Sequence, residues 1–260
     1  TLMNLINTIE SMKKVFLFAA LALLCLACNE AGKSVSVTVS NATSLERDGE
    51  MAEVSMSEVS SKLQLPDTAQ IVVVDAEGQQ VPYQITSDEK VIFPVSVQAN
   101  GSTVYTIKAG IPQECPVKAC GRYYPERVDD VAWENDLVAF RTYGPALQET
   151  GERAFGYDIW TKYNTTEPVV EARYEGELNP DTKAKIAELG KTDPKAAQEL
   201  YRSVSYHVDH GNGLDCYKVG PTLGGGTAAL MAGDTIIYPY CYATQEILDN
   251  GPLRFTVRLV

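Results

Sequence analysis

Positive charge and histidine are both scarce in this sequence. Lysine and arginine total 22 against 34 aspartate and glutamate residues, which gives a net charge of −12. A protein that binds the phosphate backbone of nucleic acid needs a basic face, so this composition argues against a nucleic-acid partner. An anionic small substrate stays open, because a local cluster of Arg or Lys in a cleft is enough to hold one.

Several patterns that mark familiar enzyme classes are also missing. The chain has no Gly-x-Ser-x-Gly elbow, no complete Gly-x-x-x-x-Gly-Lys-Ser/Thr loop and no pair of Cys-x-x-Cys motifs. These absences argue against the corresponding serine hydrolase, phosphate loop and zinc ribbon. Glycine crowds residues 211–226, but no helical pattern follows it, so we assign these glycines to tight turns.

Near its start the sequence carries the pattern of a bacterial lipoprotein signal. Met12-Lys13-Lys14 precedes the 13-residue apolar run Val15–Ala27, which is shorter than the ~20 residues needed to span a bilayer. Ala27 before Cys28 resembles a lipobox, so we expect Cys28 to be the lipid anchor and residues 1–28 to be upstream sequence and signal peptide. The prediction is an exported protein, a periplasmic or outer-membrane lipoprotein, that touches the membrane only through this anchor. A plain signal peptide cut near Ala27 is the alternative.

Alternating strands dominate the rest of the chain, and the predicted fold class is all-β. Short apolar runs with Gly, Asn and Ser turns between residues 34 and 110 predict a small N-terminal β-sandwich. After a proline-containing linker, residues 120–260 are richer in Tyr, Trp, Arg and Asp, and we predict a second, carbohydrate-active domain there. Leu253 to Leu259 alternates like a strand up to the last residue, so we expect this second domain to be truncated at its C-terminus.

Within the second domain, residues 138–143, 157–162 and 203–209 alternate as strands with one apolar and one polar-aromatic face. A short helical excursion is predicted between them, with one helix over Pro180–Leu189 ended by Gly190 and another from Asp193 to about Arg202. A sheet with one polar-aromatic face suits sugar binding.

Four cysteines follow the signal, namely Cys115, Cys120, Cys216 and Cys241. An oxidising compartment permits disulfides, and four cysteines allow three pairings, among which the sequence does not choose. A local Cys115–Cys120 pair is one of them.

The two histidines are the sharpest chemical signal. His207 and His210 lie within four residues of each other, where a predicted strand enters a glycine-rich loop, and histidine suits proton transfer near neutral pH. We therefore predict His207 as the catalytic base or acid, with His210 or Tyr217 as its counterpart and Asp209 beside it. A metal held by His207, Asp209 and His210 is disfavoured, because the two imidazoles of a strand would point to opposite faces. A structural turn is the other alternative.

Substrate binding is predicted on the polar-aromatic faces of the neighbouring strands. Arg141 and Lys162 are candidates for the substrate carboxylate, and Trp160 is a candidate stacking platform with Asp158 on its face. The segment 123–136 is dense in carboxylates, arginine and aromatics, and we assign its members to binding or structure rather than acid catalysis. The residues of that segment counted as substrate-binding candidates are Arg127 and Glu134.

Four segments together carry a family resemblance: Arg127 to Gly144, Phe155 to Lys162, His207 to Gly224 and Asn250 to Leu259. They resemble blocks of one domain-of-unknown-function family of secreted proteins from polysaccharide-degrading bacteria, over roughly residues 35–260. The family is similar to the ulvan oligosaccharide dehydratase, and its larger domain resembles a galactose-mutarotase-type β-supersandwich. The resemblance implies elimination of water from an unsaturated uronate sugar, and assigns no role to an individual residue. Family chains continue beyond the last of these blocks, in line with the expected truncation.

The sequence thus predicts a carbohydrate-active lyase or dehydratase that acts on oligosaccharides of an acidic, uronate-containing polysaccharide. No organic cofactor is implied. Two alternatives stay open: a glycoside hydrolase that uses carboxylates such as Glu134 and Asp158, and a non-catalytic glycan-binding lipoprotein.

Overall fold

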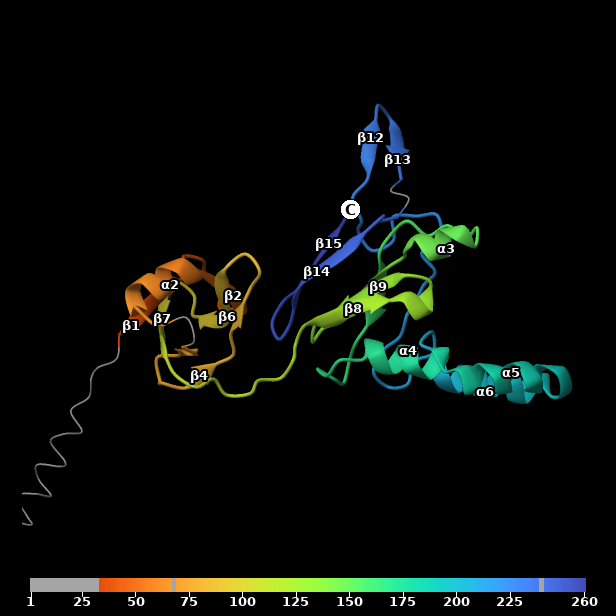
Figure 1. The fold of residues 1–260 in the computed structure, drawn as a ribbon, viewed down its shortest axis with the longest axis horizontal. Helices are drawn as coiled ribbons and strands as arrows, with labels where there is room; N and C mark the ends of the chain where they lie inside the picture. Colours follow the sequence, from red (N-terminus) through yellow and green to blue (C-terminus); the bar gives the residue numbers. More distant parts are fainter. Residues whose placement is uncertain (1–32, 67–68, 239–240) are drawn as a thin grey trace, which may run out of the picture.

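A computed structural model describes residues 33–66, 69–238 and 241–260 of the chain. The predicted signal and Cys28 lie outside these residues. Strands in several antiparallel sheets make up most of the ordered structure, which confirms the all-β class (Figure 1). No helix in the described residues is long and apolar enough to cross a membrane.

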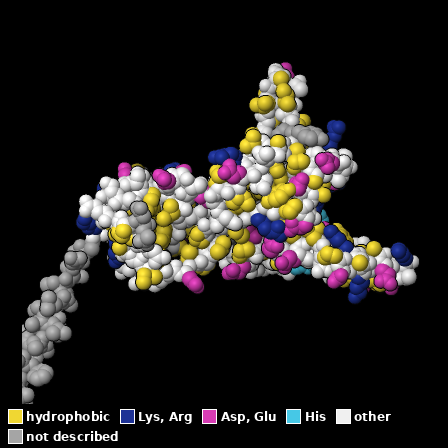
Figure 2. Space-filling view, viewed as in Figure 1, with side chains coloured by type: hydrophobic (Ala, Val, Ile, Leu, Met, Phe, Trp, Pro, Cys, Tyr) yellow, Lys and Arg dark blue, Asp and Glu magenta, His cyan; other side chains and the backbone are white. Residues whose placement is uncertain are grey.

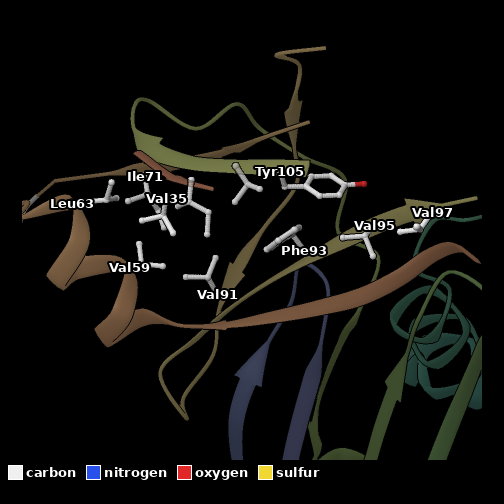
Figure 3. Close-up of a cluster of buried hydrophobic side chains, with 11 residues drawn as sticks. Val35, Val59, Leu63, Ile71, Val91, Phe93, Val95, Val97 and Tyr105 are labelled. Carbon is white, nitrogen blue, oxygen red and sulfur yellow. The ribbon is translucent and has the colours of Figure 1, made fainter. Parts of the chain in front are cut away.

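The first part of the chain forms two sheets around one apolar core. One sheet has the order β1 (Ser34–Ser40), β7 (Ser102–Ala109), β3 (Ile71–Val74), β4 (Gln80–Val81), and the other β2 (Arg47–Ser55), β6 (Lys90–Val97), β5 (Gln84–Ile85). The core takes Val35 and Tyr105 from the first sheet and Phe93 from the second (Figure 3). Helix α2 (Met56–Leu63), which the sequence analysis did not predict, adds Val59 and Leu63.

A four-stranded antiparallel sheet organises the second part. Its order is β11 (Asp158–Thr161), β10 (Val138–Thr142), β9 (Asp130–Glu134), β8 (Cys120–Tyr124), with the 3-10 turn η1 (Pro125–Arg127) between β8 and β9. Helix α3 (Pro145–Glu149) follows β10, and two hairpins complete the part: β12 (Leu230–Ala232) with β13 (Thr235–Ile237), and β14 (Gln245–Asn250) with β15 (Phe255–Leu259). Hydrophobic side chains gather on the projecting β12–β13 hairpin (Figure 2).

Three helices, one more than predicted, lie between β11 and the histidines: α4 (Val170–Leu178), α5 (Pro180–Thr192) and α6 (Pro194–Val204). The side chains of Asn179 and Asp193 cap α5 and α6 by accepting hydrogen bonds from the backbone, and a proline occupies the first turn of each. The predicted end at Gly190 is wrong, because α5 continues to Thr192. The predicted strand over 203–209 is also wrong, because its first two residues end α6 and a turn follows.

The two faces of the β8–β11 sheet are both covered, but by different elements. Arg141 and Ala139 of β10 face the buried side of the sheet. Trp160 of β11 and Tyr174 of α4 pack on that side. On the other side, the Trp133 ring stacks on Phe255 of β15 with 6.3 Å between centroids. The polar-aromatic face that we expected to be open is therefore largely interior.

The β14–β15 hairpin joins the two parts of the molecule. Gln84, which is 6% exposed, accepts hydrogen bonds from the backbone N–H groups of Leu253 and Arg254 and donates one to the Arg254 carbonyl. The turn also reaches the second part, since the Pro252 carbonyl accepts from the backbone of Lys118 and Ala119.

Candidate functional site

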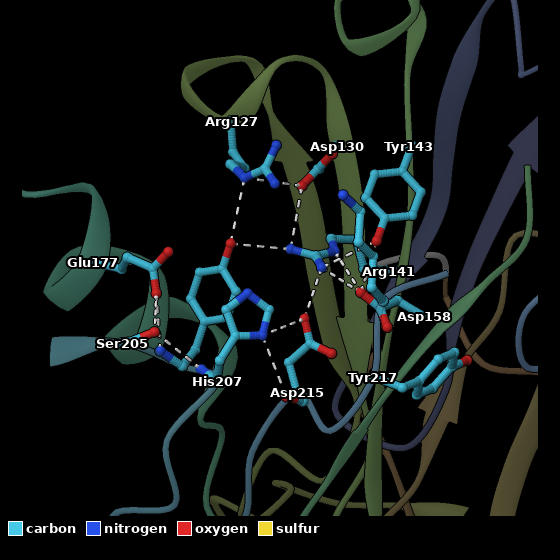
Figure 4. A network of polar contacts seen from close by, with 12 residues as sticks. Arg127, Asp130, Arg141, Tyr143, Asp158, Glu177, Ser205, His207, Asp215 and Tyr217 are labelled. Carbon is cyan, nitrogen blue, oxygen red and sulfur yellow. Dashed lines mark hydrogen bonds and ion pairs between the residues drawn. The ribbon is translucent and has the colours of Figure 1, made fainter. Parts of the chain in front are cut away.

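A hollow of about 430 Å³, here called the His207 hollow, opens where β10, the turn after α6 and residues 214–218 meet (Figure 4). Its walls are rich in groups that can move protons or hold an anion. They come from Arg127, Arg141, Tyr143, Glu152, His207, Leu214, Asp215, Cys216, Tyr217 and Lys218.

Arg141 forms the floor of this hollow and is 2% exposed. Its guanidinium contacts the carboxylate of Asp158 through Nε at 3.0 Å and also through Nη2, and Nη2 donates to Asp215 at 2.9 Å. Nη1 donates to the Tyr206 hydroxyl at 3.3 Å and lies 3.8 Å from Asp130. Buried charges need such partners, so most of the hydrogen-bonding capacity of Arg141 is committed within the protein.

Three buried carboxylates surround this guanidinium: Asp130, Asp158 and Asp215. In each of them the Oδ1 atom is buried without a hydrogen-bond partner. Burial raises the pKa of Asp130 and of Asp215 to about 6, although the positive charge of Arg141 acts in the opposite direction. The three carboxylates outnumber the two nearby guanidiniums, those of Arg141 and Arg127. A further positive charge beside the cluster is therefore electrostatically favourable.

His207 supplies a titratable group at the edge of the cluster. Its side chain is 45% exposed, and Nδ1 lies 3.4 Å from Asp215 Oδ2 and 3.3 Å from the Asp215 carbonyl oxygen. The turn that carries it is fixed from α4, because the Glu177 carboxylate accepts from Ser205 Oγ at 2.8 Å and from the Tyr206 N–H at 3.0 Å. The His207 N–H in turn donates to Ser205 Oγ at 3.3 Å. The imidazole therefore stands on a braced turn with one nitrogen against a carboxylate.

Four of the predicted site residues meet in this hollow: His207, Tyr217, Arg141 and Arg127. The Tyr217 hydroxyl donates to the Tyr157 carbonyl at 2.9 Å. The Arg127 guanidinium lies 3.9 Å from Asp130, and its Nε donates to the Tyr206 hydroxyl at 3.4 Å.

The predicted stacking platform is not available. Trp160 is 1% exposed, and its ring lies between Tyr206, stacked at 4.9 Å, and Tyr174, edge-on at 5.4 Å. Asp158 on the same face is fully buried and is held by Arg141 and by the Tyr143 hydroxyl at 2.9 Å. Both residues build the core beneath the hollow, which corrects their assignment to substrate contact.

Lys162 and Glu134 form an internal ion pair instead of a substrate site. Their side chains are 1% and 3% exposed, with Nζ 2.8 Å from Oε2. Glu134 also accepts from the backbone N–H groups of Val169 and Val170 at 2.9 Å, where α4 begins. The Glu134 carboxylate therefore caps the free N–H groups at the start of α4. Because both side chains are buried, the expectation that Lys162 and Glu134 contact the substrate is corrected.

His210 and Asp209 lie away from the His207 hollow. His210 Nε2 is 3.0 Å from the Ser205 carbonyl oxygen, and the residue lines a different hollow. Asp209 accepts from the Tyr163 hydroxyl and from the N–H groups of Gly211 and Gly213, at 2.8 and 3.2 Å, which is the turn alternative of the sequence analysis. Across residues 33–66, 69–238 and 241–260, no group of three or more His, Cys, Asp or Glu side chains is arranged to hold a metal ion.

Sequence reasoning missed Asp215, Tyr143 and Tyr206, which complete the cluster. Asp215 lies two positions before Tyr217, so in an extended segment both side chains point to the same side. This spacing was the local signal that could have placed Asp215 beside a predicted site residue. Cys216 and the other three described cysteines form no disulfide.

The fold and the site together define a strand-rich domain with a buried Arg–carboxylate cluster beneath an open, histidine-bearing hollow. Residues 39–260 match the family described as Domain of unknown function (DUF4861), and the chain belongs to this family. The chain is similar to "Uncharacterized protein P7" of Formosa agariphila, with 25% identity over an alignment of 257 residues that covers 92% of this chain. It spans 59% of the length of that relative.

Proposed function

We propose that this protein is a carbohydrate-active lyase or dehydratase for oligosaccharides of an acidic, uronate-containing polysaccharide. The observation that carries the proposal is His207 Nδ1 at 3.4 Å from the Asp215 carboxylate, on the wall of a hollow that also holds Arg127 and Lys218. The resemblance to a family of secreted proteins from polysaccharide-degrading bacteria suggests the same class of substrate.

Elimination next to a carboxylate needs a base, an acid and a positive charge. The base takes the proton on the carbon beside the carboxylate, the electrons form a carbon–carbon double bond, and the bond to the leaving oxygen breaks. That oxygen leaves with a proton, as water in a dehydratase or as a sugar hydroxyl in a lyase. His207 is the base, since Asp215 orients its ring through Nδ1 and stabilises the imidazolium that forms.

The same imidazole is also placed to return the proton to the leaving oxygen. Tyr217 lines the hollow, but its hydroxyl already donates to the Tyr157 carbonyl, and His210 lines another hollow. A single base and acid on one side of the sugar favours loss of proton and leaving group from the same face. Arg127 and Lys218 hold the substrate carboxylate, whose charge grows as the proton leaves.

A glycoside hydrolase is disfavoured by the positions of its candidate carboxylates. Glu134 is bound to Lys162 and to the start of α4, and Asp158 is bound to Arg141, so neither reaches a glycosidic bond without breaking a buried ion pair.

The test is a mass spectrum of uronate-containing oligosaccharides after incubation with the protein. We expect loss of one water or chain cleavage with a new double bond, and ultraviolet absorbance from that bond. His207→Ala should lower turnover by about 10²–10⁴-fold, the usual contribution of a positioned proton-transfer group. Lys195→Ala, whose side chain is 87% exposed on α6, is the control and should retain activity. Cleavage without a double bond, unchanged oligosaccharides, or full activity of His207→Ala would overturn the proposal.

A further inference from the structure

A second hollow, here called the Arg173 hollow, lies on the other side of the turn that bears His207. Its volume is about 400 Å³, and α4, the end of α6 and the loops at Thr165 and Asn212 form its walls. Tyr206 lines it while the hydroxyl of the same residue accepts from Arg127 and Arg141 of the His207 hollow. One turn therefore presents one histidine to each hollow, His207 to the first and His210 to the second.

Arg173 in this hollow is a buried cation without a carboxylate partner. The residue is 9% exposed, and its Nη2 donates only to neutral groups, the carbonyl oxygens of Thr161 at 3.2 Å and Asn212 at 3.0 Å and the Asn212 side chain. Nη1 is buried and has no hydrogen-bond partner. Among the described residues no carboxylate oxygen lies within 4.0 Å of its guanidinium, whereas Arg141 contacts three carboxylates.

A buried charge is costly unless it is paired and hydrogen-bonded. Burial lowers the pKa of Arg173, although the more distant carboxylates of Glu134, Asp209 and Asp215 act in the opposite direction. An unpaired guanidinium donor beside a hollow suits the binding of an anion. An oxyanion would supply both a hydrogen-bond acceptor for Nη1 and a negative charge for the guanidinium.

We propose that the Arg173 hollow binds the oxyanion of an acidic saccharide, a carboxylate or a sulfate, as a site separate from the His207 hollow. Arg173 supplies the charge, and His210, exposed on the wall and held through Nε2 by the Ser205 carbonyl, adds a second cation when protonated. Thr165, Ser203 and Asn212 offer hydroxyl and amide groups to the sugar ring. Glu167 also lines the hollow, but it is exposed, so solvent screens its charge. Because Nη1 is buried, a ligand oxygen reaches it only when side chains that line the hollow move aside.

Binding at this site can be followed through Trp160, because the Arg173 guanidinium lies 5.7 Å from the centre of its ring. The sequence has two tryptophans, so in a Trp133→Phe background the fluorescence of the full chain reports Trp160 alone. The probes are glucuronate, inorganic sulfate and, as a neutral control, glucose. We expect a saturable change with glucuronate, with sulfate or with both, and none with glucose.

Substitutions assign the change to the site. Arg173→Met should weaken oxyanion binding by about tenfold or more, the value of one charge-assisted hydrogen bond, and Arg173→Lys should retain part of it. Arg202→Met removes an exposed arginine of α6 and should leave binding unchanged. If circular dichroism shows that Arg173→Met is unfolded, His210→Gln replaces it as the weakened variant.

Three outcomes would overturn this inference: no saturable signal with either oxyanion, equal binding of glucose, or unchanged affinity in folded Arg173→Met. The inference is independent of the proposed elimination. His207→Ala should keep oxyanion binding at the Arg173 hollow while it loses turnover, so failure of one proposal leaves the other measurable.

Discussion

Asp130 should make the protein less stable as the pH rises from about 4 to about 6, and Asp130→Asn should remove this contribution. The carboxyl is fully buried, and its pKa is raised by burial from the ordinary 3.8 to about 6. Between these two values the folded protein keeps a proton that the unfolded chain has lost. The folded state then binds more protons at Asp130, so the contribution of Asp130 to the free energy of unfolding falls as pH rises through this window and is constant above it.

The size of the effect follows from the shift. The shift from 3.8 to about 6 is roughly two pKa units, and each unit corresponds to about 1.4 kcal/mol. At pH 4 the unfolded chain has already lost part of this proton, so the contribution falls by about 2 kcal/mol between pH 4 and pH 7. The asparagine variant keeps an acceptor for the Tyr174 hydroxyl, which donates to Asp130 Oδ2 at 3.0 Å. Arg127 and Arg141 stay charged throughout this range, so they change the stability of the variant but not its pH dependence.

Urea unfolding of the wild-type protein and of Asp130→Asn at several values between pH 4 and pH 7 measures this contribution. The variant should gain about 2 kcal/mol relative to the wild type as the pH rises across that range. Asp181→Asn, an exposed position in the first turn of α5, controls for the loss of a surface charge and should follow the wild type. A constant difference between wild type and Asp130→Asn at all pH values would refute the reasoning.

Three further predictions concern other parts of the chain. Lys162→Met should lower the free energy of unfolding by about 3–5 kcal/mol, because it leaves the buried Glu134 carboxylate without its cation, and the double variant Glu134→Gln/Lys162→Met should recover part of this loss in the same urea experiment. Gly156→Ala should lower the melting temperature, since its Cβ would lie 2.1 Å from the backbone carbon of Leu223; an unchanged melting temperature would contradict this contact. We also propose that Cys28 is acylated, so Cys28→Ser should move the protein from the membrane fraction to the soluble fraction and abolish labelling with palmitate.

Local signals predicted the elements whose determinants are local. Helix α5 begins at the predicted Pro180, and α6 begins where Asp193-Pro194 predicts it, because a cap and a proline act within one turn. The error after α6 has a local cause as well. Val204, Tyr206 and Val208 alternate like a strand, but Ala197, Leu200 and Val204 also repeat with the helical period, and that period prevails up to Val204.

Helix α4 could not be predicted from its own sequence. The residue before α4, Val169, has no side chain that can cap the helix, and Glu134 accepts from the N–H groups of Val169 and Val170 instead. Glu134 lies on β9, more than thirty positions earlier. The same helix explains the errors at the site. Alternation correctly placed Arg141, Asp158 and Trp160 on one face of the sheet, but it does not reveal that α4 and Tyr206 cover that face.

The contacts of Gln84 determine whether the N-terminal sheets can be separated from the rest of the fold. Its side-chain amide forms hydrogen bonds with the backbone of the turn at Leu253 and Arg254. Asp249 of the same hairpin accepts from the Ser87 N–H at 2.6 Å. Nearly 170 residues of chain separate these partners, so the first and last segments of the described fold are mutually dependent. A chimera that contained residues 34–110 without the β14–β15 hairpin would leave the Gln84 amide without its hydrogen-bond partners and expose its apolar surroundings. The N-terminal sheets and the β14–β15 hairpin therefore form one exchangeable part rather than two.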